Sequence, residues 1–256
     1  MTDQNLGLYV DADSGQFVTC TDDAVRQNKA GALVTLQTRE GERKYRYMKA
    51  QETFAAGQVS ELYQFIDNAD VDAAQAITTK VLKGTGDFVA GEFNDGTFPS
   101  AYVSIDANTG AMQTRAIERN VGSTDFLTLD KNWDVALDTT SDYVTYDINY
   151  VRLADTDNGV PIVMGIAIGV VTAGNWGWFQ VGGFCPMVRQ ISSTDALVAG
   201  ESIVASATAG ACRGLTNGGT TADEVAQAFG RVLHASAAAE VAGAGAAVLL
   251  AMPWAC

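Results

Sequence analysis

The chain has 256 residues, enough to bury a sizeable core in one large all-β domain or in two smaller ones. Its 30 acidic and 16 basic residues give a formal net charge of -14, so its overall field repels nucleic acid, and we expect no nucleic-acid partner. Only 18% of the residues are charged, while 26 are glycine and 4 are proline, which is typical of short strands joined by glycine turns. The composition therefore predicts an all-β fold of short antiparallel strands with at most one or two short helices.

The N-terminal residues 1–30 are polar and predict an arm ahead of the first strand. They lack a basic region followed by an apolar stretch, so we expect no secretory signal and synthesis in a cytosol. The apolar stretch 161–171 is shorter than the roughly 20 residues of a spanning helix and predicts a core strand. The tail 235–254 is interrupted by Glu240, glycines and Pro253, so we expect no membrane partner.

The first predicted hairpin joins residues 31–36 to residues 44–48, with Tyr45 and Tyr47 on one face of its second strand. Lys44 and Arg46 fall on the opposite face. Basic residues gather here and predict a solvated strand face, with electrostatic contact to an acidic partner as the alternative. They are Arg39, Arg43, Lys44, Arg46 and Lys49.

Further elements follow up to residue 157. Apolar residues at helical spacing predict a short helix over 71–82. Strands are expected at 101–106 and 111–117, joined by a tight turn at Asn108-Thr109-Gly110, because Asn and Gly tolerate a left-handed backbone. Alternating patterns predict extended segments over 133–138 and 144–150.

After the polar stretch 155–159 the composition becomes rich in Gly, Ala and Val, which predicts a boundary between an N-terminal β-rich domain at 31–157 and a C-terminal β-barrel-like domain at 158–256. Strands are expected in the second domain near residues 162–171, 178–181, 202–207, 231–233 and 247–250. Residues 221–224 resemble a capping box for a two-turn helix.

The segment 172–183 stands out because Trp176, Trp178 and Phe179 follow a Gly-Asn turn and lead to two glycines. Trp176, Trp178 and Gln180 share one face of the expected strand, and Phe179 lies on the other. We expect these aromatic residues to pack in a core. A sugar-binding or protein-binding face is the alternative.

Motifs for catalysis are missing from the sequence. The single histidine, His234, has no second histidine or spaced cysteine beside it, so a structural role is expected. Residues 155–166 do not match a calcium loop, because glycine and the final acid are misplaced. Four widely spaced cysteines, Cys20, Cys185, Cys212 and Cys256, predict reduced thiols rather than a metal or redox site. We expect no enzyme, no cofactor and no metal; a hydrolase with dispersed carboxylates is the alternative.

A run of short motifs in the second half resembles the tailed-phage capsid decoration, or head cement, proteins. The motifs occur at residues 165–167, 172–183, 199–202, 208–211, 229–233 and 248–250, and residues 44–50 look similar to the N-terminal region of that family. The resemblance covers about the last hundred residues best. Simple decoration proteins are shorter, so residues 51–155 depart from the pattern and indicate an extra domain or another virion part.

The resemblance implies a β-barrel, β-tulip-like or sandwich module on the outer capsid surface of a virion, made in the host cytoplasm. Its implied partners are the major capsid protein and copies of itself, with a homotrimer favoured. The alternative is a receptor- or carbohydrate-binding virion module of a knob or fibre. Candidate interface residues are Trp176, Trp178, Phe179, Arg43, Lys44 and Arg46.

Overall fold

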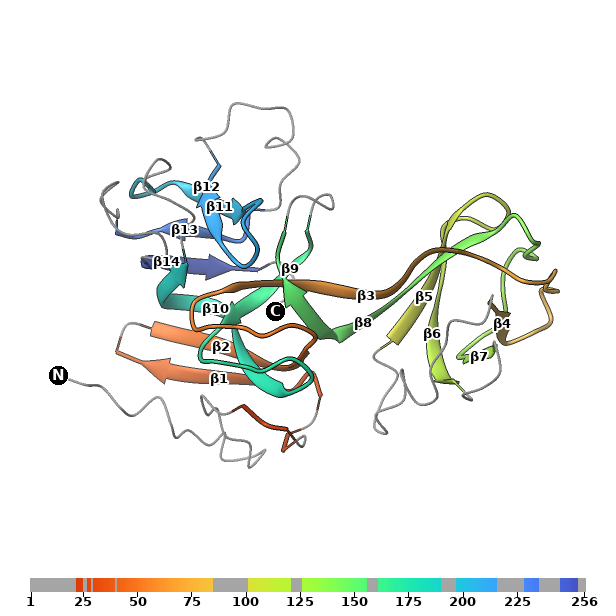
Figure 1. The fold of residues 1–256 in the computed structure, drawn as a ribbon, viewed down its shortest axis with the longest axis horizontal. Helices are drawn as coiled ribbons and strands as arrows, with labels where there is room; N and C mark the ends of the chain where they lie inside the picture. The colour runs from red at the N-terminus through yellow and green to blue at the C-terminus, as the bar shows by residue number, and fades with distance from the viewer. Residues whose placement is uncertain are drawn as a thin grey trace. The chain divides into compact units, whose positions relative to one another are not determined.

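The computed structural model describes residues 22–24, 27–28, 30–39, 41–84, 101–120, 126–155, 161–189, 197–215, 228–234 and 245–252. All the regular elements in these residues are β-strands, which confirms the predicted all-β class. The chain forms two compact units: unit 1 comprises Met1–Leu62 and Asn149–Cys256, and unit 2 comprises Tyr63–Ile148. Two strands, β3 (Val59–Asp70) and β8 (Asp142–Leu153), pass from one unit into the other (Figure 1).

This division differs from the expected boundary between residues 157 and 158. β8 lies before that point and β9 (Val163–Ala167) after it, yet unit 1 contains all of β9 and the second half of β8. The composition changes at residue 157 because few acidic residues follow it, not because a unit ends there. Unit 2 is an insertion within unit 1.

Unit 1 contains a closed ring of five strands. β10 (Trp176–Arg189) pairs with β2 (Gly41–Ala50) and with β9; β9 pairs with β3, β3 lies beside β8, and β8 returns to β2. The closing pair of β8 and β2 is parallel, with Lys49 opposite Tyr150. All five residues of β9 are buried, as predicted for a core strand.

The same sheet continues in unit 1 from the C-terminal half of β10. The order of the added strands is β12-β11-β13-β14, and β14 pairs antiparallel with β10. Buried aliphatic side chains from these strands, from β9 and from β10 form one core. The strands are β11 (Ser202–Ala205), β12 (Cys212–Gly214), β13 (Gly230–Val232) and β14 (Gly245–Ala251).

The predicted N-terminal hairpin is confirmed. β1 (Leu33–Thr38) pairs antiparallel with β2, and Val34 lies opposite Tyr45. Tyr45 and Tyr47 are buried, whereas Lys44 and Arg46 on the opposite face are half-buried. The two tyrosines and the two basic residues therefore differ in burial as the period-2 pattern predicted.

Unit 2 packs its own core between strands in the order β8-β5-β6-β7-β4. The predicted hairpin is present as β5 and β6, and its turn holds Asn108 and Gly110 at φ of 59° and 80°. The four strands confined to this unit are β4 (Val81–Lys83), β5 (Ala101–Ala107), β6 (Gln113–Asn120) and β7 (Phe126–Leu129).

Two expected elements of unit 2 were wrong. Residues 71–82 form no helix, because Gln75 forms two backbone hydrogen bonds with Leu137 and Val81 begins β4. Residues 133–138 form no strand either. Trp133 is buried and Asp134 is exposed, but the segment pairs with another part of the chain only through the isolated bridge between Leu137 and Gln75. The capping box at 221–224 lies outside the described residues.

Candidate functional site

The aromatic segment of unit 1 forms the first half of β10. Its two faces are both buried, because the strand lies between two packed layers of side chains. On the face inside the ring, the Phe179 ring meets the edge of Phe54 at a centroid distance of 5.1 Å, next to Met48 and Met164. This half of the segment is core, as expected.

The opposite face of β10 carries a cluster of aromatic rings. Tyr47 stacks on Trp176 with centroids 5.6 Å apart and lies 5.1 Å from Trp178. Tyr150 contacts Trp176 edge-on at 6.0 Å. Such pairs add to the stability gained from burying large rings.

The N-terminal segment covers this cluster. Asp23 pairs with Trp176 through two backbone hydrogen bonds of 2.9 Å, and its carboxylate accepts a 2.7 Å bond from the Tyr47 hydroxyl. Burial raises the pKa of Tyr47 well above its ordinary value, so the hydroxyl stays a proton donor. Burial acts to raise the pKa of Asp22 too, but hydrogen bonds from Thr172 and Asn175 lower it overall.

The three aromatic interface candidates are therefore placed in the interior. Trp176, Trp178 and Phe179 are 6%, 1% and 0% exposed. A stacking platform for a sugar needs an open ring face, and these rings are covered by the chain's own residues. None of these three rings presents an exposed face for a contact.

The three basic candidates lie in the same unit but form no single exposed group. Arg43 is buried, with its guanidinium 5.3 Å from the centre of the Phe184 ring. Lys44 lies 3.7 Å from Glu42, and Arg46 donates a 3.3 Å hydrogen bond to Asn149. Partners within the chain thus occupy all three.

Glu61 is a buried carboxylate of unit 1. Its Oε1 accepts a 2.5 Å hydrogen bond from Arg152 Nε, and its Oε2 accepts one of 3.3 Å from the Asp155 amide. Burial raises its pKa, and the Arg152 cation opposes that rise. This ion pair suits a structural role, because the charges of Glu61 and Arg152 compensate each other.

The tip of the β5–β6 hairpin in unit 2 is a site that the sequence analysis did not identify. Met112 sits there at φ 70°, a left-handed conformation rare outside glycine and asparagine, and its side chain is 93% exposed. Its amide donates a 2.8 Å hydrogen bond to the Ile105 carbonyl. The available signal was a methionine two residues after the turn sequence Asn108-Thr109-Gly110, where polar residues are usual.

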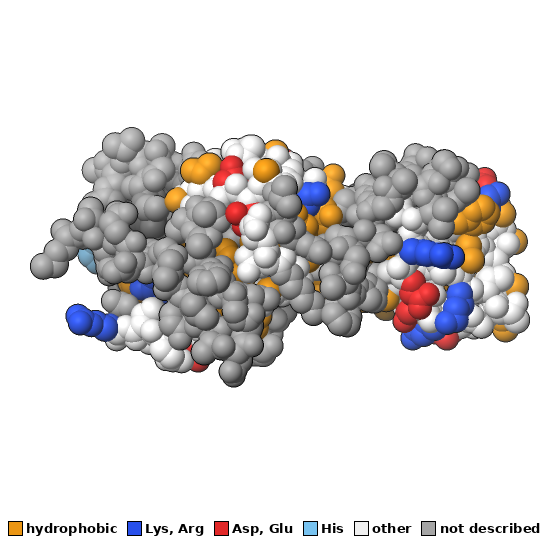
Figure 2. Space-filling view, turned by 90° about the horizontal axis from the view of Figure 1, so that it is seen from below, with side chains coloured by type: hydrophobic (Ala, Val, Ile, Leu, Met, Phe, Trp, Pro, Cys, Tyr) orange, Lys and Arg blue, Asp and Glu red, His pale blue; other side chains and the backbone are white. Residues whose placement is uncertain are grey.

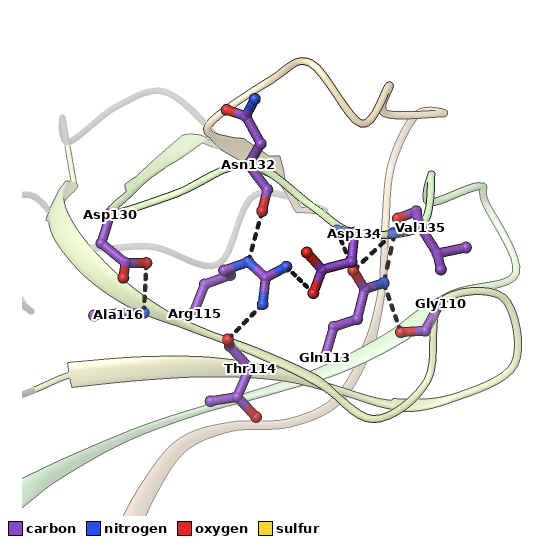
Figure 3. A network of polar contacts seen from close by, with 9 residues as sticks. All are labelled: Gly110, Gln113, Thr114, Arg115, Ala116, Asp130, Asn132, Asp134 and Val135. Carbon is purple, nitrogen blue, oxygen red and sulfur yellow. Dashed lines mark hydrogen bonds and ion pairs between the residues drawn. The ribbon is translucent and has the colours of Figure 1, made fainter.

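Gln113 holds this tip against the segment 133–137 (Figure 3). Its side-chain oxygen accepts hydrogen bonds of 2.6 Å and 2.9 Å from the amides of Asp134 and Val135. Its nitrogen donates to the carbonyls of Gly110 and Val135 at 2.8 Å and 3.2 Å. A buried amide that makes four bonds fixes both loops in one arrangement.

Arg115 extends the network from the same face of β6. Its Nε donates to the Asn132 carbonyl at 2.8 Å, and its guanidinium forms a 2.8 Å ion pair with Asp134 (Figure 3). The guanidinium also lies 5.3 Å from the centre of the Trp133 ring. This buried cation anchors the 130–134 loop to the sheet.

Carboxylates gather around the same hairpin end. Asp142 accepts a 2.8 Å hydrogen bond from Asn108 in the turn. The neighbouring carboxyl of Asp70, partial burial and the charge of Asp106 together raise the pKa of Asp142. In the part of the chain described, no group of three or more His, Cys, Asp or Glu is placed to hold a metal.

The structure also places the histidine and two of the four cysteines. His234 is exposed to solvent. Cys185 and Cys212 are buried free thiols, as expected, while Cys20 and Cys256 lie outside the described residues. Among the described residues there is no helix with the length and hydropathy to cross a membrane.

The hairpin tip presents apolar and acidic side chains on rigid loops, and unit 1 supplies a densely packed body. Comparison with protein-family models, with curated proteins and with solved structures finds no significant match to this chain.

Proposed function

We propose that the chain is a non-enzymatic structural protein of a tailed-phage particle that decorates or cements the outer capsid surface. In this proposal it is made in the host cytoplasm, binds the lattice of the major capsid protein and associates with itself, with a trimer favoured. The resemblance to head cement proteins suggests the assignment, and the all-β construction is compatible with it.

The observation that carries the proposal is the position of β10. This segment holds the strongest part of the resemblance, and it is a 14-residue strand paired with β2, β9 and β14. Its large rings pack into both neighbouring layers, so they stabilise the body of the protein. A shell component needs a stable body with binding surface elsewhere, and that division of roles fits this chain.

The alternative of a sugar-binding knob or fibre module rested on Trp176 and Trp178 as stacking platforms. Both are buried in unit 1, so this alternative loses its supporting residues. Receptor binding through another surface would still leave the chain in the particle but at the tail or fibre.

The test is cryo-electron microscopy of particles from the source of the sequence, combined with protein identification by mass spectrometry. We expect this chain in the particle, with density that repeats with the lattice and bridges neighbouring capsid subunits. Density confined to the tail or fibres would favour the alternative. Particles that lack the chain altogether would refute a virion role.

A further inference from the structure

Met112 is exposed in a place where physical chemistry gives it no local reason to be. A non-glycine residue at φ 70° is strained, and asparagine or glycine would reduce that strain. At 93% exposure the side chain recovers nothing from burial. Strained backbone held at one position is a reason to look for function there.

The loops around Met112 are rigid. Gln113 ties Gly110 to Val135 through its side-chain amide, and Ser141 Oγ donates a 2.6 Å hydrogen bond to the Thr109 carbonyl. A Cβ on Gly110 would come within 2.5 Å of the Leu137 side chain, so turn and loop are in close contact. The methionine is therefore presented in one position, which lowers the entropic cost of binding.

Two further apolar side chains are exposed on the adjoining loops. Val135, whose backbone is held by Gln113, is 51% exposed. Ile77 is also 51% exposed, two residues after Gln75, which pairs with Leu137. Together we call Ile77, Met112 and Val135 the apolar tip. Methionine suits such a surface because its flexible thioether adapts to a partner.

The charge around the apolar tip is negative. Asp134 and Asp138 lie on the loop before β8, Asp142 begins β8, and Asp106 lies near the end of β5, before the turn. Residues 63–148 contain 14 acidic and 5 basic residues, so this third of the chain carries most of the net charge of -14. Figure 2 shows acidic, basic and apolar side chains together on the surface of unit 2.

We propose that the apolar tip of unit 2 is the surface through which this protein docks on its protein partner. The chemistry it fits is an apolar socket bordered by lysine and arginine side chains, with the methionine as the central anchor and the carboxylates as the rim. The inference rests on the proposed function, because the partner it addresses is the capsid lattice.

The test measures binding of the full chain to capsids assembled without it, by co-sedimentation. M112N/V135N removes the apolar groups, and asparagine tolerates the left-handed backbone at position 112, so the fold should be kept. We expect apparent affinity to fall by about ten-fold or more. The control V170N/V198N changes two exposed valines of unit 1 and should bind like the wild type.

A second variant addresses the rim. D106N/D142N removes two charges, and we expect a shallower loss of binding with added salt than in the wild type, because rim charges act mainly at long range. Circular dichroism and the melting temperature of each variant establish that it is folded.

The outcomes distinguish failure of the proposed function from failure of the docking surface alone. Failure of the wild-type chain to bind capsids overturns the proposed function and, with it, this docking surface. Wild-type binding that M112N/V135N leaves unchanged, or that V170N/V198N weakens equally, overturns the docking surface alone. Loss confined to M112N/V135N, with the altered salt dependence of D106N/D142N, supports it.

Discussion

Gln113 shows at the residue scale how one buried amide organises a surface. Its four hydrogen bonds satisfy two backbone amides and two carbonyls in loops that have no strand partner for them. Q113A leaves these four backbone groups without a partner or bonded to water, and we expect the free energy of unfolding to fall by about 2–3 kcal/mol. Urea denaturation followed by fluorescence measures the change.

The matched control for Q113A is N132A. Arg115 binds the backbone carbonyl of Asn132 and not its side chain, so this substitution should leave stability within about 0.5 kcal/mol of the wild type. Equal stability of Q113A and N132A would show that the Gln113 bonds do not fix the tip.

The buried thiols give a second prediction at this scale. Burial raises the pKa of Cys212 to about 12, with a smaller contribution from Cys185, so the reactive thiolate of Cys212 is scarce at neutral pH. In a C20S/C256S variant, we expect no labelling by a thiol reagent until the chain unfolds. Labelling of the native variant at the rate of a free thiol would contradict the burial of both residues.

At the scale of the element, glycine allows β10 to pass close to β2. Gly183 has φ 80°, and a Cβ there would lie 1.9 Å from the Glu42 carbonyl oxygen. Gly174, just before β10, has φ 85° with open space around it. The two positions separate backbone strain from collision with a neighbouring strand.

We therefore expect G174A and G183A to differ. G174A should cost about 1 kcal/mol from backbone strain alone. G183A should cost clearly more and broaden the unfolding transition, because β2 and β10 must separate to admit the methyl group. Thermal unfolding followed by circular dichroism tests this, and an equal loss in both variants would rule out the steric account.

The success of the sequence predictions at this scale follows from where each backbone finds its hydrogen bonds. Alternation identified β2 because its ladder partners and its buried tyrosines agree. The alternation over 133–138 was misleading, because the backbone amides of Asp134 and Val135 bond to the Gln113 side chain instead of to a neighbouring strand. The helical spacing over 71–82 was equally local, and pairing of Gln75 with Leu137 overrode it.

The candidate site was harder to predict than the strands. The rings of β10 were recognised as a core element, but the sequence does not say that the N-terminal residue Asp23 covers Trp176 from 153 positions away. The apolar tip depends on contacts between the hairpin turn and residues 133–141. Only the fold brings those segments together, so the sequence alone gave no reason to single out Met112 near the turn.

For the whole molecule, the uneven distribution of charge matters more than its total. Unit 2 concentrates the carboxylates, and the polar face of β8 is buried while Val144 and Tyr146 are only half-buried. The expected boundary at 157 followed composition, which reports where acids lie, whereas the units follow from strand pairing. An insertion whose flanking strands belong to both units leaves no linker for composition to reveal.

In unit 2, two substitutions that each remove one negative charge should shift the melting temperature in opposite directions. Asp142 is repelled by Asp70 and Asp106, so D142N should raise the melting temperature at neutral pH. Asp72 lies 2.6 Å from the Lys83 ammonium, so D72N should lower it. Calorimetry at low and at high salt measures both shifts, and added salt should shrink each of them. The same sign for both variants would exclude this electrostatic account.

The pH dependence of the D142N effect has a fixed direction. The pKa of Asp142 is raised in the folded state, so that state binds a proton more tightly than the unfolded chain does. The wild type therefore regains stability at this position as pH falls through the raised pKa toward the ordinary carboxyl value of about 4. The advantage of D142N should be largest at neutral pH and vanish in that range, because Asp142 then loses the charge that Asp70 and Asp106 repel. An advantage that persists once the carboxyl is protonated would have to come from packing or hydrogen bonding by the new amide.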